Sequence, residues 1–144
     1  MEQDLNSFIL NSLGNARGDI NTYSPLALAF LGDAVLAIIV RTAVLAKGNM
    51  PADTLHAHSS HIVRATSQSA LLKAVQDELT EEEADIFRRG RNANPRTHAK
   101  NASVNDYRVA TGYEALLGWL YLKGEDARAL ELVRLGMERT GLEF

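Results

Sequence analysis

Two long stretches of this sequence are apolar on every side of a helix, and they limit the fold more than any other feature. Between residues 26 and 40, thirteen of fifteen residues are apolar, and the exceptions are Gly32 and Asp33. Between residues 109 and 122, Glu114 is the only charged residue. A helix that is apolar all round is normally enclosed by other elements. The two stretches therefore predict two buried helices.

Helix signals are strong along most of the chain, whereas no alternating pattern framed by tight turns indicates a strand. Ser24 followed by Pro25 predicts an N-cap and a first helical residue, and Thr80 with Glu83 has the pattern of a capping box. The expected helices span residues 25–46, residues 51–79 (either continuous or broken in the middle), residues 80–91, residues 105–123 and residues 125–140. Short connections between them indicate a compact all-α domain.

Length and composition are those of a single globular domain. A chain of 144 residues is long enough to bury a core without covalent staples. It has no cysteine, which excludes disulfides and thiolate metal sites. Residues 1–14 lack the basic cluster of a secretory signal, and the apolar run at residues 26–40 is short for a membrane span. We expect one soluble, cytoplasmic domain over residues 1–144 that has no membrane partner.

The charge of the chain is distributed unevenly. The net charge is −3, yet residues 88–108 hold six of the fifteen basic residues and a single acid, Asp106. The basic residues are Arg88, Arg89, Arg91, Arg96, Lys100 and Arg108. A basic segment on an acidic body is a local electrostatic footprint of the kind that binds nucleic acid. The alternative is a charged loop that is merely solvated.

The two acids inside the apolar runs are the candidate functional residues. Ionised carboxylates are rarely buried unless they are paired or bound to a metal. One interpretation is that Asp33 and Glu114 converge and hold a divalent cation such as Mg²⁺, which accepts one or two carboxylates together with water. The other is that they form structural ion pairs with the flanking Arg41 and Arg108. The pattern leaves both open.

Glycines and histidines near these residues admit simpler explanations. Gly32, Gly112 and Gly118 lie inside the expected central helices, where close helix packing is the favoured reason and space beside the carboxylates a compatible second one. The spacing of His56, His58 and His61 does not bring all three to one helix face, so a zinc site is not expected.

Two motifs together resemble a known family. Residues 28–36 resemble the sequence motif of the ribonuclease III catalytic domain, and residues 113–118 resemble the second acidic motif of that family on a later helix. The matching strings are Phe30-Leu31-Gly32-Asp33-Ala34-Val35-Leu36 and Tyr113-Glu114-Ala115-Leu116-Leu117-Gly118. The order and separation of the two motifs also agree with the family.

The departures from the general family pattern point to one subgroup. Ala29 and Thr111 occupy positions where the family usually has two further acids. We also expect no double-stranded-RNA-binding domain after the catalytic domain. Both features, and the segments at residues 89–93 and 100–102, resemble the Mini-ribonuclease III subgroup, whose members are bacterial homodimers that mature large-subunit ribosomal RNA precursors.

The resemblance implies a compact, homodimeric, all-α ribonuclease III-type endonuclease domain of about six to seven helices. It implies a metal-dependent endoribonuclease that cleaves double-stranded RNA and matures the 23S ribosomal RNA precursor. It also implies that Asp33 and Glu114 are catalytic residues that hold Mg²⁺. The missing acids favour one ion over two. The expected RNA-binding residues are Arg88, Arg89, Arg91, Asn92, Arg96, Thr97, Lys100 and Asn101.

Two rival hypotheses remain open. The first is a catalytically silent module with the same fold that binds double-stranded RNA, which the residues at positions 29 and 111 would favour. The second is a helical dimerisation domain without a nucleic-acid partner, in which the two acids form ion pairs with arginines.

Overall fold

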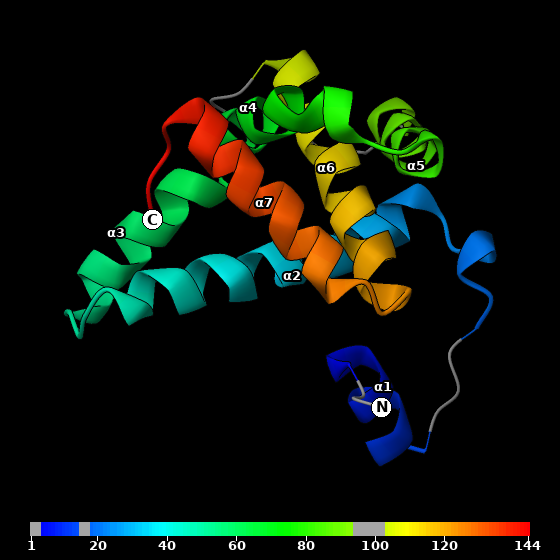
Figure 1. Ribbon diagram of the computed structural model, residues 1–144, viewed down its shortest axis with the longest axis horizontal. Coiled ribbons are helices and arrows are strands. Elements are labelled where there is room, and N and C mark those ends of the chain that lie inside the picture. The colour runs from blue at the N-terminus through cyan, green and yellow to red at the C-terminus, as the bar shows by residue number, and fades with distance from the viewer. Residues whose placement is uncertain (1–3, 15–17, 94–102) are drawn as a thin grey trace.

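The computed structural model describes residues 4–14, 18–93 and 103–144, and the regular structure in these ranges is entirely helical (Figure 1). The predicted all-α fold is confirmed. The helices, in chain order, are α1 (Leu5–Ser12), the 3₁₀ turn η1 (Ile20–Thr22), α2 (Pro25–Ala46), α3 (Ala52–Val63), α4 (Ala65–Val75), the 3₁₀ turn η2 (Gln76–Glu78), α5 (Glu81–Asn92), α6 (Val104–Leu122) and α7 (Asp126–Thr140).

The N-caps form where the sequence predicted them. Ser24 accepts a hydrogen bond from the backbone N–H of Ala27 at 3.1 Å, and Pro25 is the first residue of α2. Thr80 and Glu83 form both hydrogen bonds of a capping box at the start of α5. Each cap satisfies backbone donors that a helix leaves unpaired at its N-terminus.

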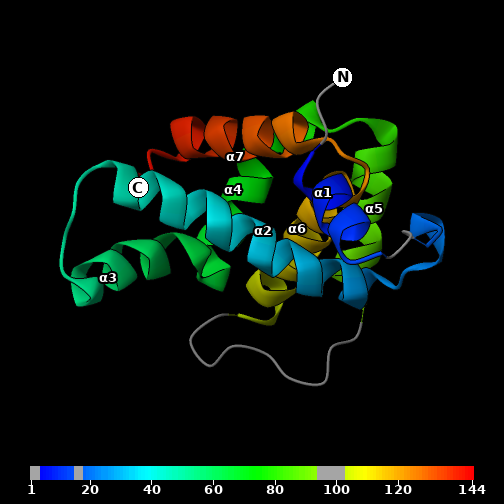
Figure 2. The same cartoon turned by 90° about the horizontal axis from the view of Figure 1, so that it is seen from below.

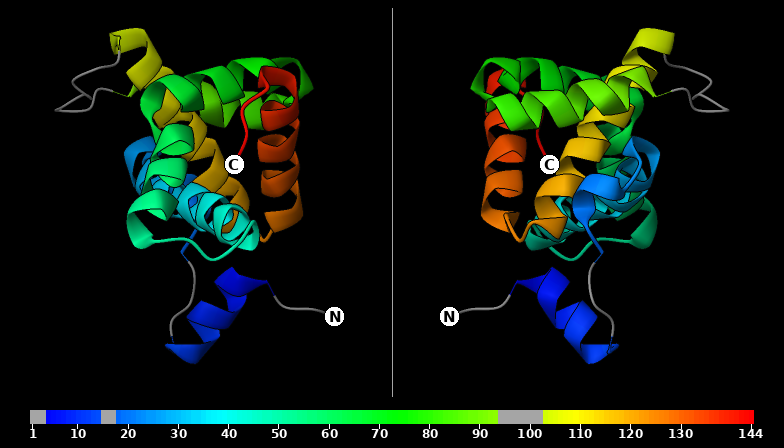
Figure 3. Two further views of the ribbon diagram at one scale, coloured as in Figure 1. Left: turned by 90° about the vertical axis from the view of Figure 1, so that its left-hand side faces the viewer. Right: turned by 90° about the vertical axis from the view of Figure 1, so that its right-hand side faces the viewer.

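Helix α6 runs through the middle of the molecule, surrounded by α2, α4, α5 and α7 (Figure 3). Eleven of its nineteen residues are buried, among them Tyr113, Leu116 and Leu120, which are fully enclosed. The prediction of a buried helix over residues 109–122 is confirmed. Around it, α5 packs closely at Gly90, and α4 meets α7 where Gly136 lies against Leu71.

Helices α2 and α6 cross with their backbones in contact. A Cβ atom on Gly32 would lie 1.7 Å from the carbonyl oxygen of Glu114, and one on Gly118 would lie 2.1 Å from the carbonyl oxygen of Leu28. Gly112 contacts Phe87 of α5 in the same way, with its Cβ position 2.6 Å from that side chain. The packing explanation for the three glycines therefore holds, and at Gly32 the packed neighbour is one of the two candidate acids.

The prediction that residues 26–40 are buried on all sides is wrong. Only seven of the 22 residues of α2 are buried, including Leu28 and Leu36, whereas Phe30 is 83% exposed and Ile38 is 59% exposed. An apolar pattern shows that a face avoids water but not which neighbour covers it, and within one copy of the chain α6 covers one side only. By length and composition α2 would also suit a membrane span, a test that core helices pass too.

The stretch from residue 51 to residue 79 is broken, one of the two alternatives left open by the sequence. α3 ends at Val63 and α4 begins at Ala65, because Arg64 between them is extended, with φ −69° and ψ 156°. Two side chains of α4 serve the carbonyl oxygens at the end of α3: Ser67 Oγ donates to His61 O at 2.7 Å, and Gln68 Nε2 donates to Val63 O at 2.6 Å.

Helix α1 was not predicted from the sequence. Asp4 caps it by accepting a hydrogen bond from the N–H of Ser7 at 2.8 Å, and Asn6 Nδ2 donates to the carbonyl oxygen of Leu122 at 3.0 Å. The side chain of Asp126, at the start of α7, also forms a hydrogen bond with the backbone of Leu5. The rest of α1 projects below the other helices in Figure 1 and therefore lies in front of α6 in the view from below (Figure 2). Its apolar residues remain largely in solvent, with Phe8 53% and Leu13 68% exposed.

Candidate active site

The α2–α6 crossing brings Asp33 and Glu114 together. Their side chains lie within hydrogen-bonding reach of each other. Asp33 is exposed to solvent, whereas Glu114 is half-buried, so the pair sits at the open edge of the crossing rather than inside the core. Burial, and then the adjoining carboxyl of Asp33, raise the pKa of Glu114 to about 8, while the amide of Gln68 lowers it.

The ion-pair interpretation of these acids is not supported. Within residues 4–14, 18–93 and 103–144, neither Asp33 nor Glu114 is bridged to a cation, and the arginines considered for that role, Arg41 and Arg108, make no salt bridge either. Two neighbouring carboxylates without a cationic partner repel each other when both are ionised. This arrangement favours binding of a cation between them.

The oxygen atoms of the site suit a hard divalent cation that keeps part of its water. Mg²⁺ is typically held by one or two carboxylates together with water and substrate phosphate. In the described part of the chain, no group of three or more His, Cys, Asp or Glu side chains is placed to hold a metal ion. Asp33 and Glu114 therefore fit a Mg²⁺ site and do not fit a closed structural zinc site.

The last turn of α5, which contains Arg89 and Arg91, packs against the stretch of α6 that contains Glu114. A Cβ on Gly90 would lie 2.8 Å from Gly112 Cα and 2.9 Å from Ala115 Cβ, so the last turn of α5 is pressed against the residues flanking Glu114. Arg89, next to Gly90, is exposed. Arg88 and Arg89 line a surface pocket together with Glu82, Asp85 and Trp119.

The α5 arginines differ in how free they are. Arg88 forms an exposed ion pair with Asp85, one turn earlier in the helix. The guanidinium of Arg91 lies 5.6 Å from the centre of the Phe87 ring and donates to Asn92 Oδ1 at 3.3 Å. The other expected RNA-binding residues, Arg96, Thr97, Lys100 and Asn101, lie outside the described residues.

A structural explanation for the α5 charges also exists. Its first turn holds Glu81, Glu82 and Glu83, and its last turn holds Arg89 and Arg91. Acids at the N-terminus and bases at the C-terminus of a helix both complement its dipole. Helix stability therefore accounts for part of this pattern.

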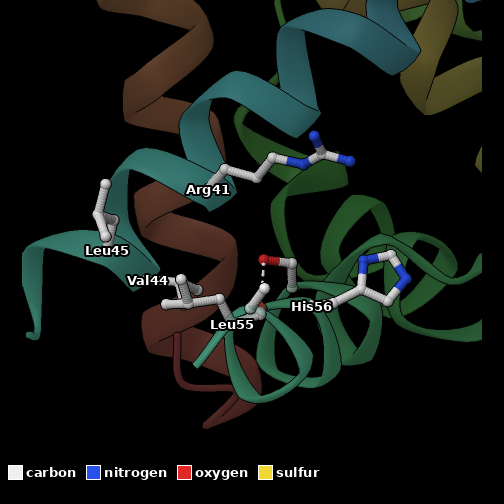
Figure 4. A pocket seen from close by; sticks show the side chains of 7 residues that line it. Arg41, Val44, Leu45, Leu55 and His56 are labelled. Atoms are coloured by element: carbon white, nitrogen blue, oxygen red, sulfur yellow. Dashed lines mark hydrogen bonds between the residues drawn. The ribbon is translucent and has the colours of Figure 1, made fainter. Parts of the chain in front are cut away.

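A separate pocket lies at the other end of α2, where it faces α3 (Figure 4). Val44, Leu45 and Leu55 give it apolar walls, and Arg41 and His56 supply its charged or titratable groups. Among the residues that the structure describes, no acid lines this pocket. It therefore lacks the ligands for a hard cation, and the carboxylate pair is the better candidate for the active site.

Gln68 was not predicted from the sequence as a residue of the site, but its side chain lies against Glu114. Gln68 is only 3% exposed, and its Nε2 lies 3.5 Å from Glu114 Oε2. A signal for it exists in the sequence, because Gln68 precedes Leu71, Leu72 and Val75 at helical spacing on the buried face of α4. A polar residue in such a position needs a buried partner.

Comparison with known families agrees with this geometry. A family model described as "Ribonuclease III domain" matches residues 26–125, a span that includes both candidate acids. The chain belongs to the ribonuclease III domain family.

Its relatives place it more narrowly. A protein of Thermoanaerobacter sp. named Mini-ribonuclease 3 is 41% identical over 138 residues, which cover 96% of this chain and 97% of that protein. The Mini-ribonuclease 3 of Clostridium tetani is 43% identical over 118 residues, covering 81% of this chain and 78% of that protein. The crystal structure of a Fusobacterium nucleatum protein superposes with a TM-score of 0.77 at 31% identity, covering 85% of this chain and 94% of that one. The chain is thus a ribonuclease that groups with the Mini-ribonuclease 3 proteins.

Proposed function

We propose that this protein is a Mg²⁺-dependent endoribonuclease that cleaves double-stranded RNA at the Asp33–Glu114 pair. The observation that supports this most directly is the meeting of two carboxylates that lie 81 residues apart in the sequence and that form no salt bridge with any cation among the described residues. A divalent cation held there would supply activation of a water molecule and stabilisation of the leaving oxygen of the phosphodiester.

The chain itself contributes ligands, orientation and RNA contacts. Asp33 and Glu114 provide carboxylate oxygens at a fixed helix crossing, and solvent reaches the pair from the Asp33 side. Arg89 and its neighbours at the end of α5 would bind the phosphates on either side of the cleaved bond. Double-stranded RNA is recognised largely through phosphates and 2′-hydroxyl groups, which suits Arg, Lys, Asn and Thr side chains. We include the remaining predicted RNA-binding residues in this proposal.

One cation at this site is better supported than two. Ala29, where the family usually has an acid, supplies no side-chain oxygen. Thr111, at the second position where the family usually has an acid, is only 6% exposed, and its hydroxyl donates a hydrogen bond to the carbonyl oxygen of Tyr107 at 3.0 Å. Neither residue therefore offers a second set of ligands.

We also propose that two copies of the chain pair through the exposed face of α2. Leu26, Phe30, Ile38 and Leu45 form a stripe on that helix, and each is at least 41% exposed. Exposed apolar stripes of this kind are typical of protein interfaces. Because Asp33 is exposed on the same helix, such a dimer would bring two carboxylate pairs to one assembly, one for each strand of an RNA duplex.

The grouping with Mini-ribonuclease 3 supports a ribosomal RNA precursor, the 23S precursor in particular, as the substrate, and the cytoplasm as the place of action. Residues 1–144 would then act as one catalytic domain that itself contacts the RNA.

Cleavage of a structured RNA duplex, with Mg²⁺ and with a chelator, tests the function. We expect cutting only with Mg²⁺. Asp33→Asn and Glu114→Gln should each abolish cutting while RNA binding persists, and Glu138→Gln, at an exposed ion pair on α7, should behave as the unmodified protein. Normal cleavage by both site variants would refute the assignment. Binding of RNA without cleavage under any metal condition would favour the catalytically silent alternative.

A further inference from the structure

The side chain of Gln68 links the carboxylate pair to the break between α3 and α4. Its Nε2 lies 2.6 Å from the carbonyl oxygen of Val63 and 3.5 Å from Glu114 Oε2. A primary amide nitrogen has two hydrogens, so it can serve both acceptors at once. The first hydrogen is taken by the backbone at the end of α3, which leaves the second for the carboxylate.

The backbone also sets which way the amide faces. If the amide were turned over, Gln68 Oε1 would oppose the carbonyl oxygen of Val63, and both donated hydrogen bonds would be lost. In its present orientation, Oε1 is buried without a hydrogen-bond partner among the described residues. An unsatisfied buried acceptor costs about 1–3 kcal/mol. An apolar side chain would fill the same space without that cost, so packing alone does not explain a glutamine here.

We propose that Gln68 is a positioning residue, whose amide, anchored on the Val63 carbonyl, holds the Glu114 carboxylate in the orientation in which it faces Asp33. This inference rests on the proposed function, because it assigns Gln68 a role at that same site. A neutral donor suits the position. A lysine or arginine would pair with Glu114 and compete with a bound cation, and an acid would add a third negative charge. Hydrogen bonds that orient a metal-binding carboxylate are a common part of metal sites.

Two variants at the same helix break separate this role from a purely structural one. Gln68→Met keeps the approximate length of the side chain and removes the donor. Ser67→Ala is the matched control, because Ser67 is also buried and donates to the last turn of α3, at His61 O, without touching Glu114. For each protein, the melting temperature is measured against Mg²⁺ concentration, and kcat and KM are measured with an RNA duplex.

Ser67→Ala should melt at lower temperature without Mg²⁺, because it removes a hydrogen bond from the break. In Gln68→Met, the loss of the hydrogen bond to Val63 O is opposed by the removal of the unpartnered Oε1. Only Gln68→Met should raise the Mg²⁺ concentration that gives half of the thermal stabilisation, by about 10- to 100-fold. It should also lower kcat while the KM for RNA stays the same. Ser67→Ala should keep the Mg²⁺ midpoint and kcat of the unmodified protein.

The proposal is overturned if Gln68→Met keeps the normal Mg²⁺ midpoint, whatever its metal-free melting temperature. Should Gln68→Met fail to fold, Gln68→Asn replaces it: the amide remains but is too short to reach both acceptors, so the same shift is expected and a normal midpoint overturns the proposal. If the unmodified protein shows no Mg²⁺ response in either melting or cleavage, the proposed function itself is refuted. If the unmodified protein responds and Gln68→Met responds in the same way, only the role of Gln68 is refuted.

Discussion

Replacement of Gly32 by alanine tests whether the helix crossing holds the two carboxylates in place. The added Cβ would lie 1.7 Å from the carbonyl oxygen of Glu114, 2.5 Å from its carbonyl carbon and 3.0 Å from its Cα. Ordinary contact between such atoms needs about 3.5 Å or more. Because all three neighbours are backbone atoms, no side chain can rotate away, and α2 and α6 must separate.

The size of the effect follows from two opposing contributions. Alanine favours a helix over glycine by about 1 kcal/mol, whereas overpacking of a tight core costs about 1–3 kcal/mol or more. A backbone clash belongs at the upper end of that range, so we expect a net loss of about 2 kcal/mol in the free energy of unfolding. Separation of the helices by about 1 Å would also lower kcat by about 100-fold.

Urea unfolding and single-turnover cleavage at saturating RNA, both at one protein concentration, measure these effects. Gly136→Ala on α7 is the control, because its Cβ would lie 3.1 Å from the nearest atom, Leu71 O, and α7 contains neither carboxylate. It should cleave at the normal rate. If Gly32→Ala unfolds at the same or a higher urea concentration and cleaves normally, the close crossing does not position the carboxylates and the argument is wrong.

Three further predictions concern charge and assembly. The pKa of Glu114 is raised to about 8 in the folded protein, so the stability that its protonated form contributes without metal is complete below about pH 4.5 and is lost as the pH rises through 8. Urea midpoints measured with chelator should therefore be lower at pH 9 than at pH 5, and Glu114→Gln should remove this part of the difference. Arg128→Ala leaves the carboxylate of Glu83, which is 3% exposed, without its cation, and should cost about 3 kcal/mol in equilibrium unfolding. Arg134→Ala, which breaks an exposed pair, should cost at most about 1 kcal/mol. Phe30→Asp should yield a monomer in sedimentation, since it puts a charge on the 83% exposed ring position of α2; a dimer of unchanged strength would place the interface elsewhere.

The helices were predictable where the cause of the helix is local. Ser24 with Pro25, and Thr80 with Glu83, determine where α2 and α5 begin through hydrogen bonds within a single turn. The ends of α6 and α7 fell within a residue or so of the expected positions for the same reason. Helix α1 escaped prediction because its cap, Asp4, precedes only eight helical residues that bury little surface.

The candidate site was predictable in part. Two acids in apolar runs were conspicuous because an ionised group in such surroundings needs a partner. The sequence could not show that Asp33 is exposed and Glu114 half-buried, since both lie in equally apolar stretches. Gln68 was missed because its partner, Glu114, is 46 residues away in the chain.

By itself, the sequence determined the helices, their caps and the pair of acids, because these depend on residues within one or two turns of each other. The tertiary structure decided which face of α2 is covered, how closely Gly32 approaches α6, and that Gln68 meets Glu114. These contacts join residues distant in the chain, and close packing between whole helices, rather than local preference, sets their distances.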